Sequence, residues 1–332
     1  MKPTIICLTP IKNEAWILDT FLQATSLWAD YIIIADQLST DGSREIALKY
    51  TKVILIDNNS ESFNEPERQK LLIQEARKIP GKRLLITLDA DEIFTPNIFE
   101  SEEWKVMITS EPGTIFKFQL ANLRPDFRTF WFEDYFPWGF MDNGVEHDVT
   151  DKIHTTRIPL PVDAESIEIK NIKVMHLQYT NWKRMQSKHR WYQCYEHVTF
   201  LEKSPVSIFR LYHHMYALNK NQINEIPKSW FVDYKNYGIN IENFKDSEVY
   251  WWDEKVIEYF DQYGTDYFQK LYIWNINWNR IAKIIGRENV NYHDPRTLFD
   301  KLYQFFLIHT QKNKDVYLIR KTTNLLRKIL SY

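Results

Sequence analysis

An alternation of short apolar runs with longer amphipathic segments fills residues 1–120 and constrains the fold of this 332-residue chain more than any other feature. The short runs read as strands, at residues 4–8, 31–35, 53–56, 84–88 and 114–120. The segments between the first four runs have helical spacing, at residues 13–28, 43–50 and 65–78. Strand, helix and strand repeated in this way predict an α/β fold of Rossmann-like type, with a mostly parallel central sheet flanked by helices.

The rest of the chain has a different pattern. Residues 122–172 are rich in aromatic and acidic residues and in prolines, and we interpret them as loops on an acceptor side. After His176 the spacing becomes helical, at residues 182–201, 208–218, 253–260, 267–285 and 296–308. A chain of this length exceeds a usual single domain. We therefore expect an α/β domain over residues 1–205 and a helical C-terminal region over residues 206–332.

The charge balance limits the partners that the chain can have. Its 42 Lys and Arg residues against 44 Asp and Glu residues give a net charge of −2. A chain without a cationic excess does not attract nucleic acid by releasing counterions, so we expect no nucleic-acid partner. A nucleotide would instead be bound as a small ligand.

Cysteine content and hydropathy indicate the compartment. Cys7 and Cys194 are too few for a disulfide framework or a zinc site, which fits a reducing cytoplasm. The first apolar run ends at Pro10, too early for a signal peptide, and no apolar stretch approaches the roughly 18 residues of a membrane span. Residues 312–332 are basic and amphipathic. They suit either a helix lying on the inner face of a membrane or a terminal helix packed on its own protein.

Paired carboxylates follow the fourth predicted strand. Residues 84–88 are apolar, and residues 89–92 read Asp-Ala-Asp-Glu. Two carboxylates at the end of a buried strand provide hard oxygen ligands for Mn²⁺ or Mg²⁺ when a diphosphate supplies further oxygens. An isolated Asp-x-Asp after a strand is also compatible with an ordinary polar turn, so the motif alone does not decide.

Three further features accompany this motif. Residues 9–14, Thr-Pro-Ile-Lys-Asn-Glu, follow the first strand, and residues 36–43, Asp-Gln-Leu-Ser-Thr-Asp-Gly-Ser, follow the second. Together with Arg68 and the acidic motif, this order resembles family 2 glycosyltransferases of the GT-A fold. The resemblance spans residues 1–201 and is closest to bacterial members that act on lipopolysaccharide or capsule precursors. It implies metal-dependent transfer of a sugar, with inversion, from a nucleotide-sugar donor such as a UDP-sugar to a glycan or glycolipid acceptor.

The resemblance also implies roles for individual residues on the donor side. Asp36 would hydrogen-bond the base or ribose, and Arg68 would face the nucleotide. The other residues that would line or shape the nucleotide pocket are Thr9, Pro10, Glu14 and Asp41.

A second group would serve the metal and the diphosphate. Asp91 would coordinate the metal ion directly, and Asp89 would contact the ribose or a metal-bound water. His176 would be a further metal ligand, since a neutral imidazole can donate a lone pair. Lys188, on a helix with Arg190 and Tyr192, would neutralise phosphate charge as the leaving group departs.

Sugar transfer with inversion also needs a carboxylate that takes the proton of the acceptor hydroxyl. Similar sequences supply this base from a Glu-Asp pair or from a His-Glu pair after the acidic motif. Residues 133–134 fit the first pattern. The second position reads Ile-His-Thr at residues 153–155, where threonine is no base, but Glu146, Asp148 and Asp151 lie just upstream. Asp134 and Asp148 are therefore the two candidates, and the sequence does not choose between them.

Three other functions remain as alternatives. A phosphatase with a strand-terminal Asp nucleophile normally has Thr or Val where this chain has Ile93. A sugar nucleotidyltransferase usually opens with a glycine-rich loop, and residues near Pro10 contain none. A catalytically inactive, carbohydrate-binding relative of glycosyltransferases would lack metal-dependent transfer.

Overall fold

The computed structural model describes residues 2–60, 63–148, 155–242, 244, 246–288, 290–329 and 332. These fall into two units, one of Met1–Thr180 with Asn224–Asp246, the other of Asn181–Ile223 with Ser247–Tyr332. The first boundary between the units follows Thr180. The sequence analysis had placed the domain boundary at residue 205. The reason is that α5 (Trp182–Thr199) packs against α6 (Pro205–Tyr212) and α8 (Trp251–Tyr263), which belong to the second unit.

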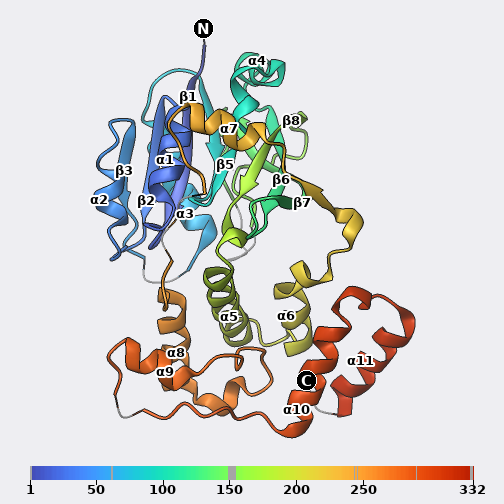
Figure 1. The fold of residues 1–332 in the computed structure, drawn as a ribbon. Helices are drawn as coiled ribbons and strands as arrows, with labels where there is room; N and C mark the ends of the chain where they lie inside the picture. Colours follow the sequence, from blue (N-terminus) through green and yellow to red (C-terminus); the bar gives the residue numbers. More distant parts are fainter. Residues whose placement is uncertain are drawn as a thin grey trace. The chain divides into compact units, whose positions relative to one another are not determined.

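The first unit is built on a nine-stranded mixed sheet with the order β3-β2-β1-β4-β7-β6-β8-β5 (Figure 1). Its first four strands are mutually parallel and match the predicted ones. They are β1 (Thr4–Ile11), β2 (Tyr31–Asp36), β3 (Val53–Asp57) and β4 (Arg83–Thr87). The predicted α/β class and the parallel character of this half are confirmed.

The other half of the sheet mixes directions. Strand β7 runs antiparallel to β4 and β6, β6 runs parallel to β8, and β5 runs antiparallel to β8. Their bounds are β5 (Glu92–Phe94), β6 (Ile115–Leu123), β7 (Thr129–Met141) and β8 (Ser166–His176), and β9 (Ile223–Glu225) pairs with β7. Of these, β6 was predicted at residues 114–120, and a strand was also expected just before His176, where β8 ends. The interpretation of residues 122–172 as loops was wrong, because β7 and β8 carry polar side chains at exposed and half-exposed positions and so lack a continuous apolar run.

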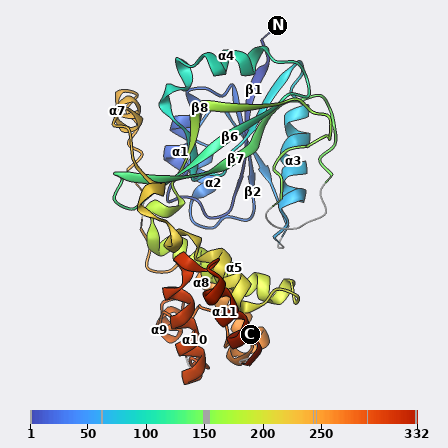
Figure 2. The same cartoon turned by 90° about the vertical axis from the view of Figure 1, so that its right-hand side faces the viewer.

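Helices cover both faces of the parallel strands (Figure 2). Successive side chains of a strand point to opposite faces. On one face Ile5 and Cys7 belong to the core that contains α1 (Leu18–Ser26), and on the other Ile6 and Leu8 pack with α3 (Glu65–Arg77). The remaining helices of this unit are α2 (Ser43–Ala47), α4 (Glu102–Thr109) and α7 (Ser229–Asn236).

The chain returns to the first unit after leaving it. Ile226 N donates to the Arg128 carbonyl at 2.8 Å, and the buried Tyr234 hydroxyl on α7 donates to the Phe94 carbonyl at 2.6 Å. These contacts attach the segment from Ile226 to Tyr234 to the first unit.

The second unit is helical, as predicted for this part of the chain. It contains α5, α6, α8, α9 (Trp278–Ile284), α10 (Leu298–His309) and α11 (Tyr317–Ile329). The helix expected over residues 267–285 is instead a short turn, Thr265–Phe268, followed by α9, because the Asn277 side chain accepts from Arg280 N and starts a new helix. Within the described residues, every helix is too short or too polar to cross a membrane.

Candidate active site

Asp91 and His176, distant in the sequence, lie together at the end of the sheet. The pairing of β5 with β8 sets Glu92 opposite His176, and Leu177 N donates to the Asp91 carbonyl at 2.7 Å. As a result His176 Nε2 stands 3.8 Å from Asp91 Oδ1. Asp91 is buried and follows β4, so its carboxylate lies at the carboxyl ends of the parallel strands, where α/β folds bind ligands.

Asn122 orients the imidazole. Asn122 Nδ2 donates to Glu133 Oε1 at 2.9 Å, which turns the amide oxygen toward His176 Nδ1 at 2.7 Å. Because an amide oxygen only accepts, Nδ1 carries the proton, and in the neutral imidazole the Nε2 lone pair lies on the side of Asp91. This is the arrangement of a metal-binding histidine held by a second hydrogen bond.

Glu133 lies at an irregularity in the sheet. In the register of β6 with β7, Gln119 pairs with Tyr135 and Ala121 with Phe132, so Leu120 faces both Glu133 and Asp134. Such a bulge re-aims side chains and is common beside active sites. Here it connects Glu133 through Asn122 to His176.

Arg157 binds the carboxylates next to Asp91. Its guanidinium lies 2.7 Å from Asp89 Oδ2, 2.5 Å from Glu92 Oε2 and 4.6 Å from the centre of the Trp138 ring. Burial raises the pKa of Glu92, and Arg157 opposes that rise. Burial lowers the pKa of Arg157, but the charges of Asp89 and Glu92 outweigh it and raise the pKa overall. Glu92 is buried and Arg157 and Asp89 are half-buried, so the three side chains form an ion cluster that fixes the acidic motif.

Asp36 carries an oxygen with no partner among the described residues. Its Oδ2 accepts from Arg44 at 2.8 Å and from Ser39 N at 3.3 Å, while Oδ1 is buried without a hydrogen bond. The hydrogen bond to Asp36 raises the pKa of Arg44. A buried carboxylate oxygen without a donor is costly, so this atom is suited to accept a hydrogen bond from a ligand.

Asp41, in the same loop region, has hydrogen-bond partners for both of its carboxylate oxygens. Its Oδ2 accepts from Ala15 N at 2.9 Å and its Oδ1 from the Ser43 hydroxyl at 2.6 Å, and Ser43 Oγ in turn accepts from Glu14 N at 2.9 Å. The loop after β1 is thus tied to the loop after β2. Asp41 therefore holds the backbone of the loop after β1 in place. The Glu14 carboxylate accepts from the Trp16 indole at 2.7 Å.

The sequence placed Thr9 and Pro10 after the first strand, and the structure corrects this. They lie inside β1, where Thr9 pairs with Ile34 and Pro10 with Ala35, and the strand continues to Ile11. Proline is accommodated there near the carboxyl end of the strand. Thr9 is fully buried, with its hydroxyl 3.6 Å from Cys7 Sγ.

Arg68 and Lys188 differ in their placement. Arg68 lies on α3 with its guanidinium 5.0 Å from the centre of the Phe63 ring and 3.9 Å from Glu65, and its Nε is buried without a partner among the described residues. Lys188 lies on α5, near Trp252. It belongs to the second unit and Asp91 to the first, so the role of Lys188 remains a prediction.

The two predicted bases are both exposed. Asp134 lies at a shallow depression with Gln119, Phe132, Glu133 and Phe136. Asp148 is exposed at the end of a described stretch.

Two residues of the second base pattern, Asp151 and His154, lie outside the described residues. Thr155 is described, and its backbone N–H donates to Glu65 Oε2 at 3.0 Å.

A divalent ion would find two protein ligands here. The described residues contain no group of three or more His, Cys, Asp or Glu side chains that could hold a metal by themselves. Asp91 and His176 offer one carboxylate and one imidazole lone pair, which fit Mn²⁺ or Mg²⁺ if a bound diphosphate and water complete the coordination.

Sequence reasoning missed Arg157, Glu92 and Asn122 and named Glu133 only as part of a pair. Glu92 was visible inside the acidic motif, but nothing in the sequence connects it to Arg157, which is 65 residues away. Asn122 carried no signal, because a single Asn in an apolar run has no characteristic spacing.

Comparison with known proteins adds little. No family model and no curated protein matches the chain. HddC from Yersinia pseudotuberculosis is a similar structure, with 10% identity, a TM-score of 0.31, and coverage of 53% of this chain and 94% of its own. A 4-diphosphocytidyl-2C-methyl-D-erythritol synthase has 9% identity, a TM-score of 0.25, and coverage of 46% and 70%. A mannose-1-phosphate geranyltransferase from Thermus thermophilus has 11% identity, a TM-score of 0.27, and coverage of 64% and 67%. Similarity this low says nothing about the activity of this chain.

Proposed function

We propose that this protein is a metal-dependent, inverting glycosyltransferase that moves a sugar from a nucleotide-diphosphate sugar, UDP-sugar in the first place, to a hydroxyl of a glycan or glycolipid acceptor. The biological setting that we propose is the synthesis of surface polysaccharide or lipopolysaccharide. The observation that carries the proposal is the pair of Asp91 and the Asn122-oriented His176, 3.8 Å apart at the carboxyl ends of the parallel strands.

The donor side of the proposal rests on Asp36 and Arg68. The unpaired Oδ1 of Asp36 would accept a hydrogen bond from the base or from a ribose hydroxyl. Arg68, with its Nε buried and unpartnered among the described residues, would face the nucleotide. Both atoms gain a partner when the nucleotide binds, so each of the two side chains favours the bound state.

The metal ion would lie between the protein and the diphosphate. Asp91 and His176 would hold Mn²⁺ or Mg²⁺, and the ion would neutralise charge on the departing diphosphate. Asp89 would contact the ribose or a metal-bound water while its other interaction, with Arg157, fixes its position. The bond from the anomeric carbon to the diphosphate oxygen breaks as the bond to the acceptor oxygen forms.

We assign the base role to Glu133, which was not one of the two predicted candidates. Glu133 is connected to His176 through Asn122 and also borders the depression that Phe132 and Phe136 line. An acceptor sugar stacked on those rings would bring its hydroxyl to the Glu133 carboxylate, which would take the proton. Asp134, its neighbour, is more exposed and serves as the matched comparison.

The first experiment tests donor and metal together by thermal denaturation. We expect UDP to raise the melting temperature more with Mn²⁺ than with EDTA, since a ligand at about a hundredfold its dissociation constant adds about 2.7 kcal/mol. Asp91→Ala should abolish this metal-dependent part and also sugar transfer. Equal shifts with Mn²⁺ and EDTA contradict a metal-bridged diphosphate, and release of pyrophosphate from a nucleoside triphosphate and a sugar phosphate indicates a nucleotidyltransferase instead.

The second experiment tests the base. Loss of general-base assistance lowers a rate by about 10²–10⁴-fold. Glu133→Gln should therefore lower transfer by this factor and leave nucleotide binding nearly intact, while Asp134→Asn should have little effect. If instead Asp134→Asn lowers transfer and Glu133→Gln does not, Asp134 is the base. If both variants keep full activity, neither residue is the base, and Asp148 is tested next.

The proposal also includes a compartment. Cys7 and Cys194 are both free and buried, which is compatible with a reducing cytoplasm.

A further inference from the structure

Helix α10 (Leu298–His309) buries polar side chains beside apolar ones on its inner face and also exposes a stripe of large apolar side chains. Asp300 and Gln304 are buried, together with Tyr303 and Leu307. A surface helix of a globular protein normally has its apolar residues toward the core and polar residues outside, so the exposed apolar stripe is the unusual feature. The five exposed apolar residues of α10 are Leu298, Phe299, Leu302, Phe305 and Ile308, the first four exposed by 56–69% and Ile308 by 38%.

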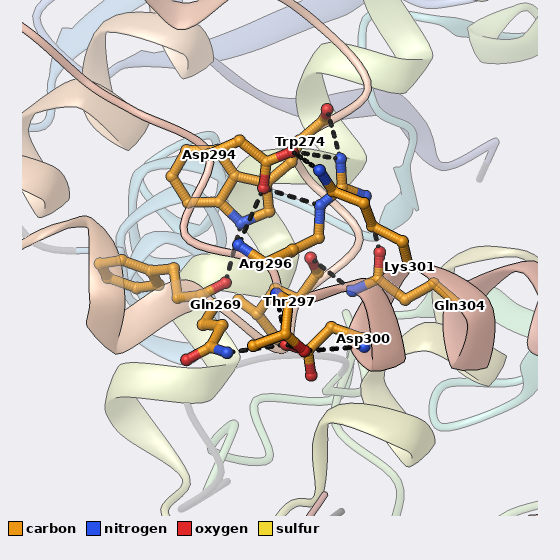
Figure 3. A network of polar contacts seen from close by, with 10 residues as sticks. Gln269, Trp274, Asp294, Arg296, Thr297, Asp300, Lys301 and Gln304 are labelled. Atoms are coloured by element: carbon orange, nitrogen blue, oxygen red, sulfur yellow. Dashed lines mark hydrogen bonds and ion pairs between the residues drawn. The ribbon is translucent and has the colours of Figure 1, made fainter.

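A hydrogen-bond network fixes this orientation (Figure 3). Asp300 Oδ2 accepts from the Thr297 hydroxyl at 2.6 Å and from Gln269 Nε2 at 2.7 Å. Gln304 accepts from Arg296 at 2.8 Å and donates to the Leu271 carbonyl at 3.2 Å. The inner face of α10 is therefore held by specific polar contacts, so the helix cannot turn its apolar face inward without breaking them.

Helix α11 (Tyr317–Ile329) adds a second exposed apolar stripe on a neighbouring helix. The two helices contact through the Tyr303 hydroxyl, which donates to the Thr323 carbonyl at 2.9 Å, and through Leu326 and Tyr332 (Figure 1). Leu318, Leu325 and Ile329 are exposed by 58–70%. These apolar side chains of α11 are neither buried in the core nor replaced by polar residues, as they would be on a helix that faces only water.

The net charge of this region distinguishes between a second copy of the chain and an anionic lipid surface as the partner of the exposed stripes. Residues 298–329 contain seven Lys and Arg residues against two Asp residues, a net charge of +5, whereas the whole chain has −2 and the remainder therefore −7. On α11 the basic residues are Arg320, Lys321, Arg327 and Lys328, with no acidic residue from Tyr317 to Ile329. Two copies of this surface would repel each other, whereas an anionic lipid surface would attract it.

We propose that α10 and α11 form a docking surface for the face of an anionic lipid membrane, with the exposed apolar side chains in the acyl region and the basic side chains at the headgroups. An interfacial helix of this kind combines an apolar face with Lys and Arg residues and lies in the plane of the membrane. Long basic side chains extend to the headgroups while their stems cover apolar surface. The sequence pattern of residues 312–332 is compatible with this surface or with packing on the protein. One side of α11 packs on α10, and the apolar stripes exposed on both helices support the surface. The proposal goes beyond sugar transfer and does not rest on it.

The test is vesicle flotation with the full chain, without nucleotide or metal. We expect the protein to float with phosphatidylcholine vesicles that contain about one third phosphatidylglycerol, to bind pure phosphatidylcholine vesicles much less, and to lose binding as salt is added. Phe305→Ser should weaken binding at least tenfold, because a buried Phe side chain contributes that much to partition. Arg327→Glu should weaken it about fivefold or more.

The control is Leu201→Ser, which removes an apolar side chain that is 79% exposed in the same unit but outside both helices, and it should bind as the native chain does. Melting curves of all variants show whether each one is folded. Failure to float with anionic vesicles overturns the proposal. A molar mass in solution that is twice the monomer and falls to the monomer with Phe305→Ser also overturns it and identifies a second copy as the occupant. Flotation unaffected by Phe305→Ser and Arg327→Glu overturns the assignment to α10 and α11.

Discussion

Arg157→Met tests whether the ion cluster with Asp89 and Glu92 is needed to keep the acidic motif folded. In the native chain Arg157 lies 2.5 Å from Glu92 Oε2, and the Glu92 side chain is 2% exposed. Methionine keeps much of the volume but removes the charge, so Glu92 is left as a buried carboxylate without its partner. Breaking a buried ion pair from one side costs about 3–5 kcal/mol. For a unit of this size, that lowers the melting temperature by about 6–20 °C.

The effect should depend on pH. Burial raises the pKa of Glu92, and the loss of Arg157 removes the attraction that opposes the rise. An acid whose pKa is raised on folding binds more protons in the folded state, so its charge destabilises the fold progressively as pH rises above the unfolded-state value of about 4.3. The loss in Arg157→Met should therefore be greatest at neutral pH and smaller near about pH 5.

Calorimetry of the native chain, Arg157→Met, Glu92→Gln and the double variant at both pH values measures this. The double variant should regain most of the lost stability, because Gln needs no counter-charge. The pH dependence of the loss should disappear with the Glu92 carboxyl. The matched control is Arg280→Met, which breaks an exposed pair with Glu248 and should cost at most about 1 kcal/mol. A change within about 1 °C at neutral pH for Arg157→Met, or a double variant less stable than both single ones, refutes the reasoning.

Two further predictions concern other contacts of the first unit. Asp36→Asn should weaken nucleotide binding about tenfold, measured by titration calorimetry, because the unpaired Oδ1 would lose its charge-assisted bond to the ligand; unchanged affinity would remove Asp36 from the donor site. Tyr234→Phe should lower the free energy of unfolding by about 1–2 kcal/mol in denaturant titrations, because the Phe94 carbonyl loses its buried donor, whereas Tyr237→Phe, at an exposed ring, should not.

Elements buried on both faces of the sheet were predictable from the sequence. β1, β2 and β4 are nearly continuous apolar runs because helices cover both faces of the parallel strands. β7 was not, because its bulge at Glu133 and its half-exposed middle break the period that identifies a strand. The strands that a local pattern can find are therefore those with the most uniform surroundings.

The residues of the candidate site also fall into those with a local sequence signal and those without one. The local motifs placed Asp36 and Asp91 near strand ends, and in the structure Asp36 is the last residue of β2 and Asp91 stands shortly after β4. His176 came from the resemblance and lies beside Asp91 in the structure. Arg157 contacts Asp89 and Glu92, which only the tertiary fold brings close, so no spacing in the sequence indicates it, and the pattern at residues 133–134 named Glu133 without its contact to Asn122. Asp36 and Asp41 show the remaining difficulty: both stand in one motif, yet one has an oxygen without a donor among the described residues and the other has both oxygens occupied by its own loops.

Helix α10 shows that periodicity identifies a helix without identifying its inner face. The spacing of residues 296–308 predicts a helix, and the usual expectation is that its apolar stripe faces the core. The stripe of Leu298, Leu302 and Phe305 faces outward instead. The inner face is chosen by Asp300 and Gln304, whose partners Gln269 and Leu271 come from a distant turn that no local pattern connects to α10. A buried carboxylate or amide is stable only when its hydrogen bonds are satisfied. These partners, together with the packing of Tyr303 and Leu307, therefore fix the inner face of α10 and leave its second apolar stripe exposed for a surface outside the chain.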